Sequence, residues 1–254
     1  MDTMRRIAVA LTNGGVGKTT TAVTLAHGLA LRGRRVLLVD CDALGQAGPL
    51  LGLTPRVGLA ELLSGSLPPD EAIVEARKNL HLLAGGRALD EVRRAIDQDG
   101  PSGVLALRRA LEPIESKYDY VIHDTAPGYD GLTVNALFHA DDVLIPVSMA
   151  ALSVKGLLDF AHRIKRTGAH DPSKGTLYIL PTFLNEGVQH SMQIYQLLQT
   201  YFSKQLCHPI RSSSQILEAS GYGKTILEHA PNSHGADDYK KLVDRIEKGP
   251  PRRR

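Results

Sequence analysis

A short glycine-rich stretch carries the residues whose types and spacing best suit phosphate chemistry. It follows the apolar run at residues 7–11 and consists of Gly14, Gly15, Val16, Gly17, Lys18, Thr19 and Thr20. Glycines let backbone N–H groups turn inward around an anion, and the N-terminus of a following helix favours negative charge. We expect Lys18 to reach the β- and γ-phosphates of a nucleotide and the Thr19 hydroxyl to bind Mg²⁺. The alternative is a plain glycine-rich turn before a helix.

Aspartates end two further apolar runs. Asp40 and Asp42 close the run at residues 35–40, and Asp124 ends the run at residues 118–124. Open α/β sheets bind their ligands at the carboxyl ends of the strands. Asp42 is therefore expected to orient an attacking water or to hold Mg²⁺ through water, and Asp124 to hold the Mg²⁺ shell. A helix cap or turn is the alternative for the first pair, and a structural role is the alternative for Asp124.

Apolar runs alternate with helical stretches along most of the chain, and a strand, a helix and a second strand predict a parallel sheet with a right-handed crossover. We expect an α/β fold of the P-loop NTPase type, a single-domain, doubly wound, mostly parallel sheet with helices on both faces. Predicted strands cover residues 7–11, 35–40, 80–84, 118–124, 143–147, 176–182 and 207–210. Predicted helices include 59–63, 86–98, 102–116, 152–167, 188–203 and 235–248. One domain over 1–249 precedes a basic tail at 250–254.

Composition narrows the class of protein. The 254 residues are 43% hydrophobic, which is ample for one α/β core, and the net charge of +3 permits a polyanionic partner without requiring one. Cys41 and Cys207 are far apart and suggest neither a disulfide framework nor a metal cluster. No apolar run approaches the roughly 20 residues that span a bilayer. We therefore expect a cytoplasmic protein with reduced thiols.

Taken together, these motifs resemble the ParA/MinD family of deviant Walker-box ATPases. The resemblance covers nearly the whole chain and is weakest over residues 49–115. It includes a C-terminal pattern, at residues 218–226 and 231–239, that a generic phosphate-loop enzyme would not carry. Within the family the chain looks most like the McdA-type branch, which positions carboxysomes.

The resemblance implies a homodimer that sandwiches two ATP molecules with Mg²⁺ and binds nucleoid DNA without sequence preference. A cargo adaptor protein would stimulate hydrolysis, so that a carboxysome or plasmid is positioned. The resemblance then implies that Lys18 and Asp42 are catalytic. It implies that Thr19, Asp42 and Asp124 bind Mg²⁺. The nucleotide is expected to contact Asn13, Gly14, Gly15, Val16, Gly17, Lys18, Thr19 and Thr20, with Thr182 and Pro209 near the adenine.

One departure from the family concerns Asn13, because the family usually has a lysine there that reaches the partner subunit's nucleotide. Asparagine supplies no positive charge to those phosphates. The McdA-type branch also lacks this lysine, and its replacement cation is thought to come from a later helix. We expect Lys155, at the start of the helix at 152–167, to take this catalytic role. A solvated surface lysine is the alternative.

Basic residues near the C-terminus are the candidates for binding DNA phosphates, a kind of binding that weakens with salt. They are Arg211, Lys224, Lys240, Lys241 and Arg245, together with the arginines of the tail. A MinD-like attachment to membranes would need a terminal amphipathic helix, and residues 249–254 offer none. A metabolic phosphate-loop enzyme, such as an ATP-dependent synthetase, is the rival from another class.

Overall fold

The computed structural model describes residues 4–169 and 175–249, which fold around one eight-stranded sheet. The strand order is β3-β4-β2-β5-β1-β6-β7-β8, and only β3 and β4 pair antiparallel. The strands are β1 Arg5–Val9, β2 Val36–Asp40, β3 Ile73–Arg77, β4 Leu80–Leu83, β5 Tyr120–Asp124, β6 Asp142–Ser148, β7 Leu177–Leu184 and β8 Ile210–Arg211. The expected fold class, a doubly wound and mostly parallel α/β sheet, is confirmed.

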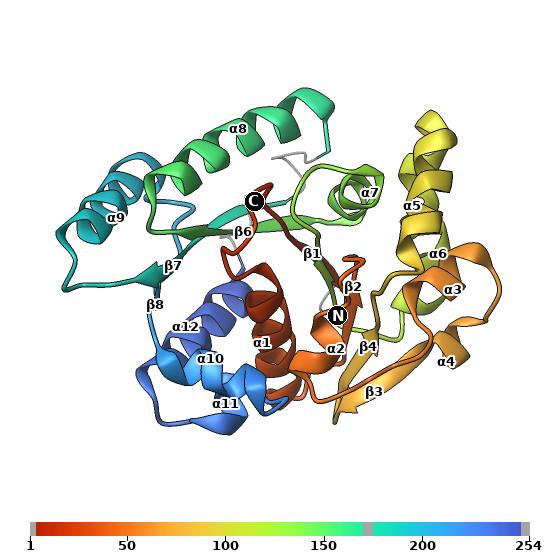
Figure 1. The fold of residues 1–254 in the computed structure, drawn as a ribbon, viewed down its shortest axis with the longest axis horizontal. Helices are drawn as coiled ribbons and strands as arrows, with labels where there is room; N and C mark the ends of the chain where they lie inside the picture. Colours follow the sequence, from red (N-terminus) through yellow and green to blue (C-terminus); the bar gives the residue numbers. More distant parts are fainter. Residues whose placement is uncertain (1–3, 170–174, 250–254) are drawn as a thin grey trace.

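Helices cover both faces of this sheet (Figure 1). On one side lie α1 Lys18–Leu31, α2 Ala47–Leu50, α10 Ser214–Gly221, α11 Ile226–His229 and α12 His234–Lys248. The other helices are α3 Leu59–Ser64, α4 Pro69–Ala72, α5 Leu89–Gln98, the 3₁₀ turn η1 Gly100–Leu105, α6 Ala106–Glu115, α7 Gly131–His139, α8 Ala151–Thr167 and α9 Gln189–Phe202. None of the described helices is both long and apolar enough to cross a membrane.

The strand sequences explain this layering, because successive side chains point to opposite faces of a sheet. In β1, Ile7 and Val9 pack with α1 and α12, whereas Ala8 packs with α8. In β5, Ile122 faces the first group of helices and Val121 faces α6 and α7. Strands buried on both faces read as continuous apolar runs, which is why they were visible in the sequence.

The sequence-based elements differ from the structure mainly at the sheet edges. The last strand shortens from residues 207–210 to Ile210–Arg211, and the antiparallel strand β3, Ile73–Arg77, was not predicted. Edge strands bury less of their surface, so their apolar signal is weak. Helix α7 was also missed. The predicted tail at 250–254 lies outside the described residues, so the predicted domain bounds stay a prediction.

Candidate functional site

The glycine-rich loop connects β1 to α1 at the carboxyl edge of the sheet. Gly15 and Gly17 have φ angles of 69° and 85°, a region that favours glycine because it has no Cβ. Gly17 is the N-cap of α1, which begins at Lys18 and is almost entirely buried. The backbone N–H groups at this helix start therefore lie where the loop turns, as an anion site requires.

Lys18 is buried in this loop, with 6% of its surface exposed. Its ammonium Nζ donates to the carbonyl oxygen of Asn13 at 2.7 Å, which keeps the side chain folded back over the loop. Burial lowers the pKa of Lys18, while the carboxylates of Asp124 and Asp42 oppose that shift. A triphosphate in the loop would supply the negative charge that this buried ammonium lacks.

The two aspartates after β2 have different surroundings. Asp40 is fully buried, and its two carboxylate oxygens accept hydrogen bonds from the backbone N–H groups of Asp42 and Ala47, each at 3.0 Å. Burial raises the pKa of Asp40 to about 6. Asp42 uses one oxygen to accept from Leu44 N–H at 2.9 Å and lines a cavity beside the loop. Asp40 thus shapes the turn, and Asp42 faces the place where chemistry can occur.

Asp124 is a fully buried carboxylate, and neither of its oxygens accepts a hydrogen bond of ordinary geometry from the described residues. Burial, together with repulsion from Asp40, raises the pKa of Asp124 well above its usual value, and the neighbouring Thr19 hydroxyl opposes this shift only in part. A charged carboxylate that is buried without a partner is energetically costly, and a cation close to Asp124 would remove that cost. The described residues contain no cluster of three or more His, Cys, Asp or Glu that would hold a metal alone. Thr19 and Asp124 therefore suit Mg²⁺ that arrives with phosphates and keeps water ligands.

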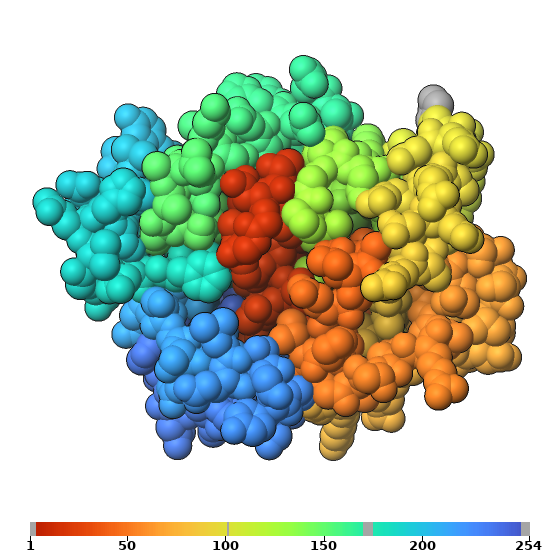
Figure 2. All heavy atoms as spheres, viewed as in Figure 1, coloured from red at the N-terminus to blue at the C-terminus, as the bar shows by residue number. Residues whose placement is uncertain are grey.

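A cavity of about 870 Å³ brings the glycine-rich loop and Asp42 together, whereas Asp40 and Asp124 are not among the residues that line it. Lys18, Thr19 and Asp42 line it, with Ser220 and Gly221 of α10 from far along the chain. In the view of Figure 2, the N-terminal segment (red) lies in the middle of the visible face, between the C-terminal segment (blue) and the segment around residues 40–60 (orange). The volume falls in the range of nucleotide-sized ligand pockets. The roles of the individual residues stay predictions.

Phe183 lines the same cavity, although no local pattern in the sequence pointed to it. Its φ of 56° is unusual for a residue with a side chain, and it sits at an irregularity between β7 and β8. Thr182, just before it, is 2% exposed, and its hydroxyl donates to Val16 O in the glycine-rich loop at 3.0 Å. Pro209 is also buried. The hydrogen bond from Thr182 stabilises the glycine-rich loop. Contact of Thr182 and Pro209 with adenine stays a prediction.

Residue 13 lies against the start of α8. A Cβ placed on Gly156 would come within 1.9 Å of the Asn13 side-chain oxygen, so the helix and the loop touch directly at this glycine. Lys155, the preceding residue, is exposed. Lys155, which is expected to replace the missing lysine, is therefore adjacent to Gly156, and Gly156 contacts Asn13, the position where the family usually has that lysine. Its catalytic role stays a prediction.

The C-terminal pattern packs on α1, the helix that follows the loop. The hydroxyl groups of Thr21 and Tyr239 are 3.4 Å apart, and burial raises the pKa of Tyr239 to about 12. His27 Nδ1 lies 2.8 Å from the Thr225 hydroxyl oxygen. This pattern therefore supports the helix beneath the phosphate loop and, through α10, completes the cavity.

The predicted DNA-binding residues differ in how free their charges are. Arg211 makes a two-point ion pair with the buried carboxylate of Asp238, at 2.9 and 2.8 Å. Lys240 donates to the Pro231 carbonyl and to Asp237, and Arg245 donates to the Lys204 carbonyl. Lys224 and Lys241 are exposed. All five stay predictions, and the charge of Arg211 is largely neutralised within the protein.

Comparison with known sequences gives close relatives over nearly the full length. Residues 4–176 match the family described as an AAA domain. The chromosome-partitioning ATPase Soj of Thermus thermophilus is 36% identical over 96% of this chain and 95% of its own. The chromosome partitioning protein ParA of Myxococcus xanthus is 33% identical over 98% of this chain and 92% of its own.

Solved structures with the same fold include proteins of two kinds. An ATP complex of a McdA variant from Cyanothece has a TM-score of 0.83 at 23% identity, covering 98% of this chain and 96% of its own, a likeness of fold alone. A cobyrinic acid a,c-diamide synthase from Mycobacterium smegmatis, bound to ADP and magnesium, has a TM-score of 0.80 at 28% identity. The alignment covers 96% of this chain and 94% of that synthase.

Proposed function

This chain belongs to the ParA family of ATPases and acts on ATP with Mg²⁺, and from that premise we propose that it is a DNA-bound positioning ATPase. In this proposal two copies close over two ATP molecules, and the closed dimer binds nucleoid DNA without sequence preference. An adaptor protein on a cargo, such as a carboxysome or plasmid, stimulates hydrolysis and releases the dimer.

The observation that carries the proposal is the composition of the nucleotide cavity. The glycine-rich loop, Asp42 and the C-terminal helix α10 line one space, so the part of the chain that distinguishes this family meets the phosphate chemistry there. Large apolar side chains are exposed around it: Leu44 lines the cavity at 72% exposed, and Leu217 and Tyr222 flank its α10 wall at 72% and 71%. Exposed apolar groups at a site rim support a protein partner, here a second copy.

Chemistry in such a site is mostly positioning and charge stabilisation. We propose that Lys18 and Thr19 hold the phosphates and Mg²⁺, that Asp124 holds the magnesium shell, and that Asp42 orients water. Lys155 would supply positive charge across the dimer in place of the missing lysine. The contact between Gly156 and Asn13 supports this, because it holds the second turn of α8, which also carries Lys155, against the loop.

Light scattering with a non-hydrolysable ATP analogue tests the dimer, and filter retention of duplex DNA at rising salt tests the binding. We expect the wild type to dimerise and to retain DNA only with the analogue, and Lys18→Ala to do neither. Asp42→Ala should stay dimeric on DNA with ATP, because hydrolysis fails after closure. Single subunits without affinity for DNA in the presence of the analogue would refute the proposal.

Lys155 and the DNA surface each need a separate variant. Lys155→Ala should lower ATP-dependent dimerisation and turnover; unchanged values would assign Lys155 to the surface. Lys240→Glu combined with Lys241→Glu should weaken DNA retention and reduce its salt dependence, because fewer counterions are released. Dimerisation of this second variant with the analogue serves as its folding control.

The alternative function, that of a metabolic ATP-dependent synthetase, is supported by one observation, the 28% identity to the diamide synthase structure. A synthetase couples ATP to a small-molecule substrate, whereas the proposed switch couples it to DNA and an adaptor. ATP turnover with added plasmid DNA, compared with turnover across a panel of carboxylic acids with glutamine, separates the two. Stimulation by a carboxylic acid and not by DNA would favour the synthetase.

A further inference from the structure

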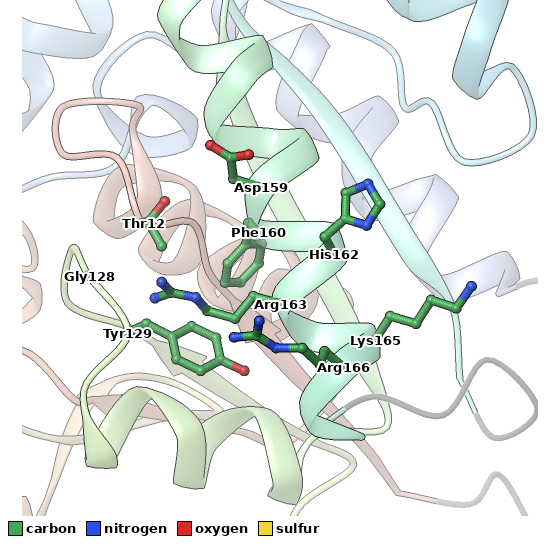
Figure 3. Close-up of a pocket in the computed structure, with 9 residues that line it drawn as sticks. All are labelled: Thr12, Gly128, Tyr129, Asp159, Phe160, His162, Arg163, Lys165 and Arg166. Carbon is green, nitrogen blue, oxygen red and sulfur yellow. The ribbon is translucent and has the colours of Figure 1, made fainter.

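A second cavity, here named the α8 pocket, lies beside the nucleotide site and has no role in the proposed function. Its volume is about 1000 Å³, and it is lined by Thr12, by Gly128 and Tyr129 after β5, and by the later turns of α8, including Arg163 and Arg166. Figure 3 shows the guanidinium groups of Arg163 and Arg166 directed to the side where Tyr129 and Gly128 lie, whereas Lys165 extends away.

The two arginines lack carboxylate partners within residues 4–169 and 175–249, in contrast to several other arginines. Ion pairs hold Arg5, Arg6, Arg32, Arg35, Arg77, Arg93 and Arg211. Asp159 lines the pocket one turn before Arg163, yet it forms no ion pair with either arginine. Two guanidinium groups that converge without a carboxylate partner present donors suited to carboxylate or phosphate oxygens.

Tyr129 gives the pocket a fixed wall. The Arg163 guanidinium lies over the Tyr129 ring, 5.0 Å from its centroid. The Tyr129 hydroxyl is 2.9 Å from the Thr167 hydroxyl, and its ring packs edge-on against Phe160. The tyrosine is thus held at both ends, and the arginine above it is oriented before any ligand arrives, which lowers the entropic cost of binding.

The pocket also touches both loops that carry the nucleotide chemistry. Gly128 N–H donates to the Thr12 carbonyl at 3.0 Å, which ties the loop after Asp124 to the residue preceding Asn13. Asn13 in turn contacts Gly156 at the start of α8. A ligand bound between α8 and these loops would therefore restrain the groups that surround the phosphates.

We propose that the α8 pocket binds a short acidic segment of a protein partner. Charge complementarity to Arg163 and Arg166 selects an anion, and the partly exposed ring of Tyr129, backed by the buried Phe160, offers apolar surface for the stems of glutamate side chains. Lys165 extends away from the pocket, so the positive charge inside it is confined to two guanidinium groups, which suits a short acidic segment better than the long phosphate backbone of duplex DNA. The proposal rests on the proposed function only in regarding this partner as a regulator of ATP turnover.

Fluorescence anisotropy with a labelled hexaglutamate peptide tests the pocket on the full-length protein. We expect saturable binding that weakens with salt, and a loss of roughly tenfold or more in the variant Arg163→Glu with Arg166→Glu, because two charge-assisted contacts become repulsive. The matched control is Arg94→Glu with Arg108→Glu, which makes the same charge change at exposed positions of α5 and α6. Its affinity should stay within about twofold of wild type. An equal loss in both variants would overturn the proposal.

Two further ligands separate the other possible occupants. If inorganic pyrophosphate displaces the peptide at equal concentration, the α8 pocket is a site for small oxyanions, and the proposal of an acidic protein segment is overturned. Loss of DNA retention in the α8 variant, with the control unchanged, would make it a DNA surface and would also overturn it. The proposed function is tested separately, by ATP-dependent dimerisation and DNA retention of the wild type. Failure of the proposed function can therefore be distinguished from failure of peptide binding.

Discussion

Gly156→Ala tests whether the start of α8 is locked against the phosphate loop. A Cβ at this position would lie 1.9 Å from the Asn13 side-chain oxygen, 2.8 Å from its Cγ and 3.1 Å from its side-chain nitrogen. The crowded atoms are the end of the half-buried Asn13 side chain, so turning that side chain into a strained rotamer costs about 0.5–1.5 kcal/mol, and up to about 3 kcal/mol if packing prevents the turn. Replacing a helical glycine with alanine contributes about 0.5–1 kcal/mol in the opposite direction. We therefore expect Gly156→Ala to lower the free energy of unfolding by up to about 2 kcal/mol.

The same substitution should change sign when the obstacle is removed. In an Asn13→Ala background all three crowded atoms are absent, so Gly156→Ala should raise stability by about 0.5–1 kcal/mol. The assay is urea unfolding of all four proteins of the cycle, or thermal unfolding, in which 1 kcal/mol corresponds to about 2–4 °C for a chain of this size.

Gly221→Ala is the control for this cycle. A Cβ there meets nothing within 4 Å, and its φ is not positive, so its effect should not depend on residue 13. Gly156→Ala raising stability equally in both backgrounds would refute the reasoning, since Asn13 would then rotate away at no cost and no lock would exist.

Three further predictions concern single groups. Lys18→Ala should abolish ATP binding in calorimetry while the protein stays folded by circular dichroism, because the buried ammonium is the cation that faces the phosphates. Asp124→Asn should weaken ATP binding in the presence of Mg²⁺ far more than in EDTA, since only the first condition uses the carboxylate; equal losses would contradict this. Arg211→Gln should lower stability at pH 7 by about 1–2 kcal/mol, a value reduced by the partial exposure of the arginine. The hydrogen bonds and charge of Arg211 hold the pKa of Asp238 below its usual value. That stabilisation is therefore present above the unfolded-state pKa and disappears as pH falls through the folded-state pKa, so the two unfolding curves should converge in acid.

Local sequence predicted the parts of the site that depend on neighbours in the chain. The glycine-rich loop, its lysine and threonine, and the aspartates at the ends of apolar runs were all found this way, because a buried parallel strand needs a continuous apolar run and its carboxyl end meets the ligand. Lys18, Thr19 and Asp42 do line one cavity. The pattern could not separate the two aspartates after β2, since only packing shows that both oxygens of Asp40 accept from backbone N–H groups.

Contacts between distant segments had no local signature. Phe183 reaches the nucleotide cavity because an irregularity in the sheet turns it there, and Arg211 loses much of its free charge to Asp238 on another helix. Gly156 looks like an ordinary helix glycine until its contact with Asn13 is seen.

The amino-acid sequence by itself determined the central strands, most of the long helices and the phosphate-binding chemistry, since these are set by residues within a few positions of one another. The tertiary structure alone decided which charges are neutralised, which residues close the cavity and where the α8 pocket lies. These properties depend on distances between side chains far apart in the chain, and the electrostatic and packing energies that fix them act through space.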